Sequence, residues 1–292
     1  MKKFQRWGAV LIAMSVMTGC SESGPNKPSS SSVTAAAMPG DLTYQEVLEK
    51  GGTVHNLSMR ASDQIWVGTN SGLYYSADRG GWGLLSSQIE YQDIVGWYID
   101  PNDPDHIIIA GHTGVMRSED GGKHWDSIGK GLPSPANIRS FVGIQEEDQL
   151  RLCAFVSGEG IYHSVDGGEI WSMWLPMDQE VYAMDFNPVE NRLYVAAQFS
   201  LFYHEDGQWK SEVVPQAQQT YSLAVDPRSG VLAVATEQGV FEKANGEWRL
   251  LNAKAPERLI VVAPGEGKTK WIGIGESALI YSLANDRWTK WN

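Results

Sequence analysis

The sequence has little cysteine, few basic residues and no long apolar run. Only Cys20 and Cys153 occur among 292 residues, so a disulfide framework is excluded, and Cys153 in LRLCAFV fits a small buried residue of a strand. Lys and Arg number 23 against 35 Asp and Glu, and the net charge of −12 argues against nucleic acid as a partner. The longest apolar run, residues 7–17, is too short to span a bilayer.

The first twenty residues predict a processed and lipidated N-terminus. Lys2, Lys3 and Arg6 precede the apolar run, which is followed by Met17-Thr18-Gly19-Cys20. This ending resembles the lipobox of bacterial lipoproteins, which implies that Cys20 is acylated with palmitate-type chains and becomes the new N-terminus. An ordinary secretory signal is the alternative. Without residues 1–19, which carry three basic and no acidic side chains, the net charge becomes −15.

The resemblance and the composition together divide the chain into three parts. Residues 1–19 form the lipoprotein signal peptide, and residues 20–40 form the lipidated cysteine with a flexible linker rich in Ser, Pro and Ala. Residues 41–292 form one large domain. We therefore expect an extracytoplasmic protein that is lipid-anchored to a bacterial membrane through Cys20.

Residues 41–292 contain six copies of one pattern and show no helical periodicity. The copies close on tryptophans about 40 residues apart: Trp82, Trp125, Trp171, Trp209, Trp248 and Trp288. A period near 40 is typical of four-stranded propeller blades. We predict an all-β fold, a β-propeller of four-stranded antiparallel blades, with six blades favoured and seven possible. The segment LTYQEVLEK (42–50) is expected to be an additional outer strand that latches the ring.

Ser, Asp, Gly and Trp recur at the end of each copy, most clearly in SEDGGKHW (118–125) and SVDGGEIW (164–171). Asp is expected to accept hydrogen bonds from its own turn, and Trp to cover the hairpin. The Trp is present in every copy while the other residues are partly lost, as expected of a packing motif. The motif residues are Ser76, Asp78, Trp82, Ser118, Asp120, Gly122, Trp125, Ser164, Asp166, Gly168, Trp171, Asp206, Trp209, Trp248 and Trp288.

The motif closely resembles the Asp-box (BNR) repeat, S-x-D-x-G-x-x-W, of the sialidase-like superfamily. That repeat is found in sialidases, sortilin-type receptors and photosystem II assembly-factor-like propellers. The resemblance covers residues 50–292 and, like WD40- or YVTN-type repeats, it implies a fold without implying a function.

A ligand site is expected at one mouth of the central channel, on the face opposite the motif. The starts of the first strands and the turns after the second strands meet there. The residues expected at equivalent first-strand positions include His55, Val95, Arg139, Tyr182, Tyr221 and Arg258. The candidate ligand-binding residues are His55, His112, Arg139, Tyr182, Tyr221, Glu237, Arg258 and Glu276. No cofactor is predicted, and no metal site, because the histidines lack ligand spacing.

The favoured function is noncatalytic: binding a protein, peptide or glycan partner, or assisting assembly at the cell envelope. The alternative is a sialidase-like glycoside hydrolase that uses the channel mouth. The resemblance to sialidases implies an arginine triad and a Tyr/Glu nucleophile pair. Only Arg139 and Arg258 are suitably placed for the triad, and the pair is available only as Tyr221 with Glu237 or Tyr182 with Glu276. The sequence thus leans away from an enzyme.

Overall fold

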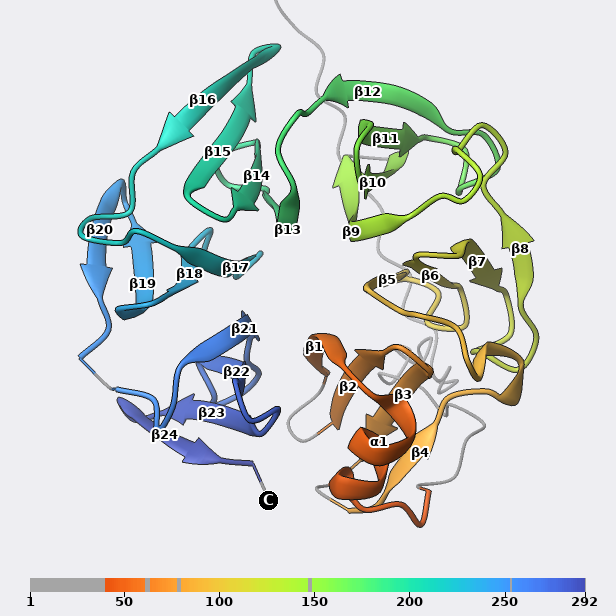
Figure 1. Cartoon of the computed structure of the whole chain (residues 1–292), viewed down its shortest axis with the longest axis horizontal. Coiled ribbons are helices and arrows are strands. Elements are labelled where there is room, and N and C mark those ends of the chain that lie inside the picture. Colours follow the sequence, from red (N-terminus) through yellow and green to blue (C-terminus); the bar gives the residue numbers. More distant parts are fainter. Residues whose placement is uncertain (1–39, 61–63, 78–79, 147–148, 253, 292) are drawn as a thin grey trace, which may run out of the picture. The chain divides into compact units, whose positions relative to one another are not determined.

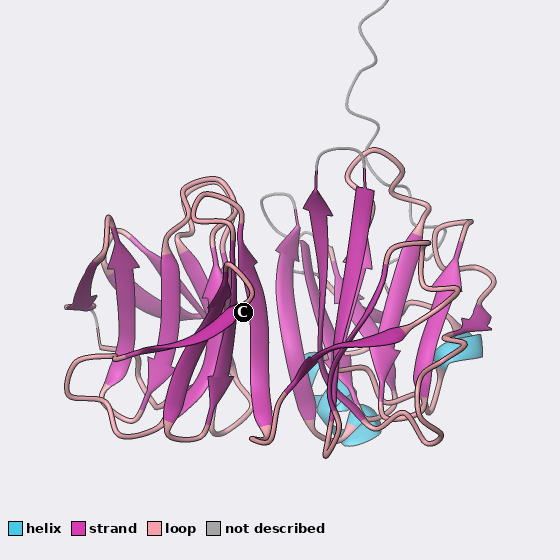
Figure 2. Cartoon of the chain, turned by 90° about the horizontal axis from the view of Figure 1, so that it is seen from above, coloured by secondary structure: helices cyan, strands magenta, loops and turns pink. Residues whose placement is uncertain are grey.

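Six four-stranded antiparallel sheets surround a central channel in the computed structural model, which describes residues 40–60, 64–77, 80–146, 149–252 and 254–291 (Figure 1). The predicted all-β propeller is confirmed, with six blades and not seven. Each blade uses four consecutive strands. The strands run between the two faces of the ring (Figure 2). Within the described part of the chain, no helix is long and apolar enough to cross a membrane.

The first three blades span residues 54–176. Blade 1 contains β1 (Val54–Arg60), β2 (Gln64–Thr69), β3 (Gly72–Ser76) and β4 (Trp82–Leu84). Blade 2 contains β5 (Gly96–Ile99), β6 (Ile107–Gly111), β7 (Gly114–Ser118) and β8 (Asp126–Ile128), after a short 3-10 helix (Ser87–Ile89). Blade 3 contains β9 (Ile138–Glu146), β10 (Gln149–Val156), β11 (Gly160–Ser164) and β12 (Ser172–Pro176).

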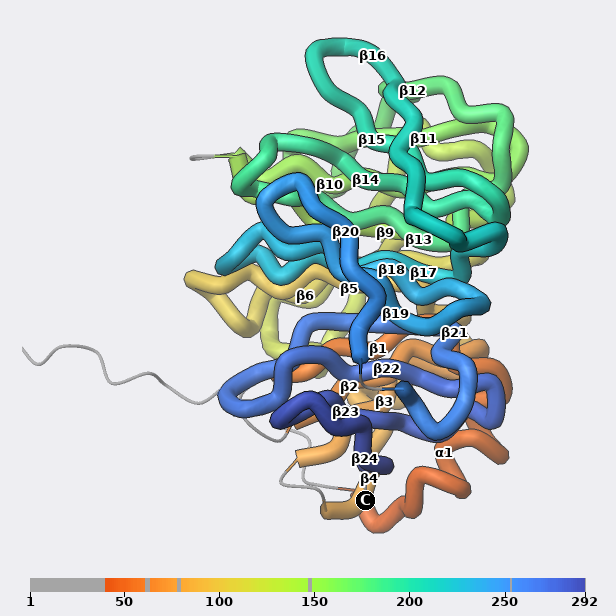
Figure 3. Tube along the Cα trace, turned by 90° about the vertical axis from the view of Figure 1, so that its left-hand side faces the viewer, coloured from red at the N-terminus to blue at the C-terminus, as the bar shows by residue number. Residues whose placement is uncertain are grey.

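The last three blades span residues 181–290 and follow one another along the chain, as the tube in Figure 3 shows. Blade 4 contains β13 (Val181–Asn187), β14 (Arg192–Ala197), β15 (Ser200–Glu205) and β16 (Gln208–Glu212). Blade 5 contains β17 (Thr220–Val225), β18 (Leu232–Thr236), β19 (Gly239–Ala244) and β20 (Glu247–Leu250). Blade 6 contains β21 (Leu259–Pro264), β22 (Trp271–Gly275), β23 (Ile280–Ala284) and β24 (Arg287–Lys290).

The second strands of blades 2, 5 and 6 are buried along their whole length. All residues of β6, β18 and β22 are buried, as expected for strands that are packed on both faces by neighbouring blades. The buried clusters join residues of adjacent blades, for example Ile108 of β6 with Leu152 of β10. The core is therefore a ring of interfaces between blades.

In the five blades whose turn between the third and fourth strands is fully described, this turn is of two kinds. In blades 2 and 3 a Ser-x-Asp-Gly-Gly turn precedes the tryptophan, and the Asp166 carboxylate accepts the Ile170 N–H at 3.0 Å. The Ser164 hydroxyl accepts the Gly168 N–H. The Gly168 carbonyl accepts the Trp171 indole N–H at 2.8 Å. The same bonds occur at Ser118, Asp120, Gly122 and Trp125.

Blades 4, 5 and 6 replace this long turn by a two-residue hairpin. The turn residues Asp206-Gly207, Asn245-Gly246 and Asn285-Asp286 all have positive φ, which is the backbone of a type I′ turn. Asn, Asp and Gly tolerate that conformation. The loss of Ser and Asp in these copies thus reflects a shorter turn that needs no side-chain acceptor.

The prediction that residues 42–50 form an outer strand is wrong. Tyr44–Gly51 is an α-helix, α1, and only Leu42 pairs with a strand, through a bridge to Trp82. A capping box starts the helix: the Thr43 hydroxyl accepts the Glu46 N–H at 3.2 Å, and the Glu46 carboxylate accepts the Thr43 N–H at 2.7 Å. The spacing Thr-x-x-Glu carried this signal in the sequence.

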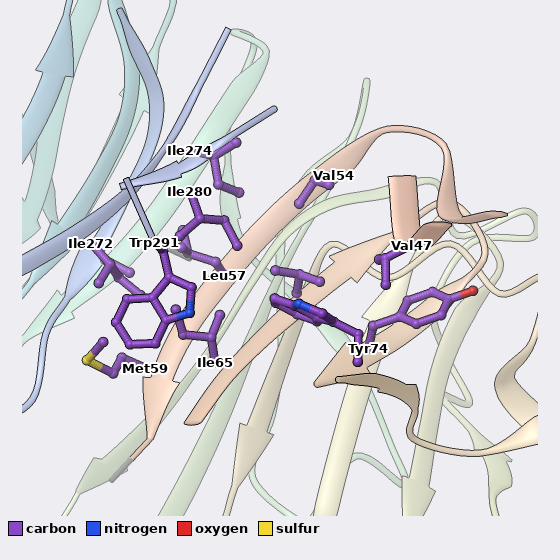
Figure 4. Packing of buried hydrophobic residues seen from close by; sticks show 13 residues of the cluster. Val47, Val54, Leu57, Met59, Ile65, Tyr74, Ile272, Ile274, Ile280 and Trp291 are labelled. Atoms are coloured by element: carbon purple, nitrogen blue, oxygen red, sulfur yellow. The ribbon is translucent and has the colours of Figure 1, made fainter. Parts of the chain in front are cut away.

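Helix α1 lies over the seam between the first and last blades. The Tyr44 hydroxyl donates to the Ala278 carbonyl of blade 6 at 2.7 Å, and Val47 packs into the cluster that joins the two blades. Figure 4 shows Leu57 and Ile65 of blade 1 beside Ile272, Ile280 and Trp291 of the C-terminal end. Because no described strand is exchanged between these blades, side-chain packing closes the ring.

Replacing Thr43 by alanine should cost about 1 kcal/mol of unfolding free energy, because the capping box loses one acceptor and the helix start frays. Denaturant unfolding measures the change. Gln45→Ala, in the same helix and exposed, is the matched control and should stay within about 0.5 kcal/mol of the parent. Equal values for the two variants would contradict this role of the cap.

Candidate functional site

The first strands line a central channel of about 800 Å³, and a β-bulge occurs at the start of five of them. A bulge leaves one residue unpaired and re-aims its side chain. The bulged residues, all of which line the channel, are His55, Arg139, Tyr182, Tyr221 and Ile260. In blade 2, Val95 takes the corresponding place immediately before β5. Five of the six predicted equivalent positions therefore agree with the strand register.

The sixth position, predicted as Arg258, is wrong by two residues. The pairing of Leu259 with Gly275 and of Val261 with Ile274 makes Ile260 the bulged residue of blade 6. Arg258 instead lies two residues ahead of the bulge, at the outer rim of the mouth. The residues at this rim position are Thr53, Asp93, Asn137, Glu180, Gln219 and Arg258. All six are polar.

His55, Asp93 and His112 form one cluster at the junction of blades 1 and 2. His55 Nε2 lies 2.7 Å from Asp93 Oδ1, and His112 Nδ1 lies 2.6 Å from Asp93 Oδ2. One carboxylate thus holds the bulged residue of blade 1 and the turn residue of blade 2. Burial by itself would raise the pKa of Asp93, but its bonds and attraction to the two imidazoles outweigh burial and lower this pKa.

His112 is held toward its neutral form. Burial lowers its pKa, and the positive charge of Arg139 and the presence of His55 act in the same direction, against the attraction of Asp93. Since an ionised Asp93 accepts from His112 Nδ1, the Nε2 atom of the neutral ring carries the lone pair. That atom is buried and has no hydrogen-bond partner among the described residues.

Tyr221, Arg258 and Glu276 repeat this arrangement at the junction of blades 5 and 6 with the charges reversed. Arg258 donates to the Tyr221 hydroxyl at 3.0 Å and contacts the Glu276 carboxylate at 2.9 Å. Here the rim residue is a cation and the turn residue an anion. The two clusters lie on either side of the seam between blades 6 and 1.

Blades 3 and 4 leave their part of the mouth open. Arg139 is exposed, and no described carboxylate lies within ion-pair distance of it. Glu180, the nearest rim carboxylate along the chain, accepts instead from the Ser157 hydroxyl. Tyr182 keeps 46% of its surface exposed and has no hydrogen-bond partner in the described part of the chain. The open sector therefore offers an uncompensated guanidinium beside a free phenol.

Glu237 lies at the rim but is occupied by the backbone, because its carboxylate accepts the N–H groups of Gln218 and Gln219 at 2.6 and 2.9 Å. Burial raises the pKa of Glu237, but these two bonds outweigh it and lower the pKa. No hydrogen bond joins Tyr221 to Glu237, or Tyr182 to Glu276, in the described chain. The structure does not assemble either Tyr/Glu pair.

The sequence analysis missed Asp93 and Glu180. Each stands two residues before a first-strand position that was identified, in QDIVGW and QEVYAM, so counting back by two from the bulge would have found both. The motif residues lie on the opposite face, and Asp206 makes no hydrogen bond through its carboxylate in the described chain. Cys20 and Asp78 lie outside the described residues.

Deeper in the channel, polar side chains of the first strands link neighbouring blades. The Ser140 hydroxyl accepts the Met184 N–H, the Ser222 hydroxyl accepts the Val262 N–H, and the Asp185 carboxylate accepts the Val225 N–H. Burial raises the pKa of Asp185 to about 6, although the backbone bonds from Val225 and Phe186 act in the other direction. These groups stabilise the ring, and both Asp185 oxygens are occupied.

The raised pKa of Asp185 predicts a stability that falls as pH rises from about 4 to about 6. Within that range the folded state binds this proton more tightly than the unfolded chain, so unfolding becomes easier once the proton is lost. Asp185→Asn removes the effect, and its unfolding free energy relative to the parent should increase by roughly 2 kcal/mol between pH 4 and pH 7. Denaturant unfolding at both pH values measures this; parallel pH profiles would contradict it.

Comparisons with known proteins support the fold and do not identify a function. No protein-family model matches this sequence, and no curated protein is significantly similar to it. Among solved structures, the chain resembles an ancestral GH74 enzyme with a TM-score of 0.59 and 18% identity, over 82% of this chain and 40% of that one. It resembles virginiamycin B lyase from Staphylococcus aureus with a TM-score of 0.57 and 11% identity, over 83% and 84%.

A third similar structure is the extracellular domain of the putative hybrid two component system BT3049 from B. thetaiotaomicron, with a TM-score of 0.56 and 15% identity over 82% of this chain and 35% of that one. This chain thus spans less than half of the GH74 and two-component structures. At such identities the likeness shows the fold alone, and the protein is a six-bladed β-propeller.

Proposed function

We propose that this protein is a noncatalytic binding module, or an assembly module of the cell envelope, that holds a protein, peptide or glycan partner at the channel mouth. The observation that carries the proposal is the open sector of blades 3 and 4. The charged groups of the two flanking clusters are paired, whereas Arg139 and Tyr182 have no partner in the described chain. Arg and Tyr are the residue types that most often dominate binding energy.

The carboxylates of the mouth support binding over hydrolysis. A glycosidase needs one carboxyl group with a raised pKa that donates a proton to the leaving group. At this mouth the pKa values of Asp93 and Glu237 are lowered, and Glu276 is paired with Arg258. Deeper in the channel the pKa of Asp185 is raised, but both of its oxygens accept backbone N–H groups, so this carboxyl is not free to act on a substrate. The similarity to GH74 and lyase propellers is a similarity of fold and does not supply the missing acid.

The proposal places the domain outside the cytoplasm on a lipid anchor. The support is the sequence MTGC at 17–20, after a basic start and a short apolar run. Two acyl chains on Cys20 would provide stable anchoring, with residues 20–40 as the tether and residues 41–292 as the propeller. We also assign the repeats to the Asp-box class, which the turn bonds of blades 2 and 3 support.

Affinity capture from solubilised envelopes tests the proposal. The full chain should retain a partner that Arg139→Ala and Arg258→Ala lose by at least tenfold, since truncating a binding Arg costs more than about 1.4 kcal/mol. Arg287→Ala is the matched control, because Arg287 is exposed on the opposite face. If the mouth variants capture as well as the parent, the binding surface lies elsewhere. Turnover of a fluorogenic glycoside that depends on Tyr221 and Glu237 would establish the hydrolase instead.

A further inference from the structure

The channel mouth carries histidines in one arc only, that of blades 1 to 3. His55 and His112 share the Asp93 carboxylate, and Arg139 of β9 lines the same channel, where its positive charge acts on His112. His55 reaches the cluster from β1, Asp93 from the segment before β5, and His112 from the turn after β6. Within the described chain, the titratable and charged groups that act on His112 are His55, Asp93 and Arg139.

We propose that this arc is an anion site that acidification strengthens, and that it takes a carboxylate-bearing segment of a protein partner. The inference rests on the proposed binding function and adds the chemistry of the ligand and its control by pH. When both imidazoles are neutral, the negative charge of Asp93 and the positive charge of Arg139 give the arc a net charge of zero. Each imidazole that gains a proton adds one positive charge to the arc.

The geometry decides which imidazole responds to a ligand. The Nε2 atom of His112 has no hydrogen-bond partner in the described chain and is buried, so a proton gained there acts on an anion bound at Arg139 through its charge. Burial and the charge of Arg139 oppose protonation of His112 and lower its pKa in the free protein. A bound carboxylate offsets the repulsion from Arg139 and favours that proton.

A protein partner fits the mouth better than a bare anion does. Three aromatic side chains are exposed on this face: Tyr182, Phe199 in the turn after β14, and Tyr91, whose N–H donates to the Ser71 carbonyl in the turn after β2. Aromatic side chains are enriched in protein interfaces. The domain is otherwise acidic, so a local positive charge discriminates between acidic and basic segments of a partner.

Binding of a glutamate-rich peptide to the full chain in detergent tests the inference by calorimetry at pH 7.5 and pH 5.5. Glutamate stays ionised at both values. The affinity should rise on the order of tenfold at pH 5.5, the gain expected from one additional charge close to the ligand. A peptide with glutamine in place of glutamate should bind weakly at both values.

Two variants distinguish the residue that makes binding depend on pH from the residue that binds the anion at every pH. His112→Asn keeps a donor to Asp93 but gains no charge, so its affinity should stay at the pH 7.5 level of the parent at both pH values. Arg139→Gln should weaken binding at both values. His124→Asn is the matched control, because His124 contacts Asp120 at 2.5 Å on the opposite face, and it should behave as the parent.

Three results overturn the inference. The first is a pH dependence that survives in His112→Asn, and the second is equal affinity at both pH values. The third is binding of an acidic oligosaccharide with no binding of the peptide. In each case the proposed function stands as long as Arg139 variants lose their captured partner. If the variants at the channel mouth capture the partner as well as the parent does, the proposed function is contradicted, and the inference that rests on it falls too.

Discussion

Replacing Glu242 by alanine is expected to cost about 3–5 kcal/mol of unfolding free energy, enough to unfold a marginal domain. Glu242 of β19 has 2% of its side chain exposed and holds three groups. Its carboxylate accepts from the Trp271 indole and contacts Lys270 at 2.5 Å each, and it contacts Arg249 at 2.9 Å. Alanine leaves the buried indole N–H unpaired and two cations without their counter-ion at the junction of blades 5 and 6.

Denaturant unfolding of the parent and the variant measures this loss, with Glu247→Ala as control. Glu247 lies on the next strand and is exposed, so its replacement should change stability by less than about 0.5 kcal/mol. Burial raises the pKa of Glu242, but bonds from Lys270, Trp271 and Arg249 outweigh it and lower the pKa. The difference between parent and variant should therefore be full above pH 4.5 and shrink below it. A loss under about 1 kcal/mol at pH 7 would contradict this role.

Trp171→Ala is expected to cost a similar amount, about 3–5 kcal/mol. Trp171 is 3% exposed and packs against Phe141 in the cluster between blades 2 and 3. Its backbone N–H also donates to the Lys130 carbonyl at the end of blade 2 at 2.8 Å. Alanine removes the ring from an interface that the surrounding strands cannot close.

Trp171→Phe divides this effect into packing and hydrogen bonding. Phenylalanine fills most of the volume but leaves the Gly168 carbonyl without the indole N–H, so a loss of about 1–2 kcal/mol is expected. Met173→Ala, on the exposed side of β12, is the control and should be nearly neutral. Should Trp171→Ala be no worse than Met173→Ala, the tryptophan would not be a packing residue.

The blade count and the strand order could be predicted because they follow from repeated local patterns. The six tryptophans follow the turns between third and fourth strands, and the second strands are largely apolar. Helix α1 could also have been predicted from Thr43 and Glu46, but a single short helix has too few residues to show periodicity.

The site could be predicted only in part, because register decides which side chain enters the channel. A bulge changes by one residue which side chain faces the channel and leaves no clear mark in the sequence. In blade 6 the predicted residue, Arg258, lies two residues before the bulged Ile260. The pairing of Asp93 with His55 joins residues of different blades, and no local pattern encodes such a contact. Patterns within a blade indicated the mouth, but only the closed ring shows which of its charges are paired.

The central claim, that the channel mouth is the binding surface, is tested most directly by photocrosslinking in the intact cell envelope. A photoreactive phenylalanine analogue in place of Tyr182 reports on the mouth, and the same analogue in place of Asn245 reports on the opposite face. The account predicts a defined adduct from position 182 that Arg139→Ala abolishes, and none from position 245. An adduct from position 245 with none from position 182 would contradict it.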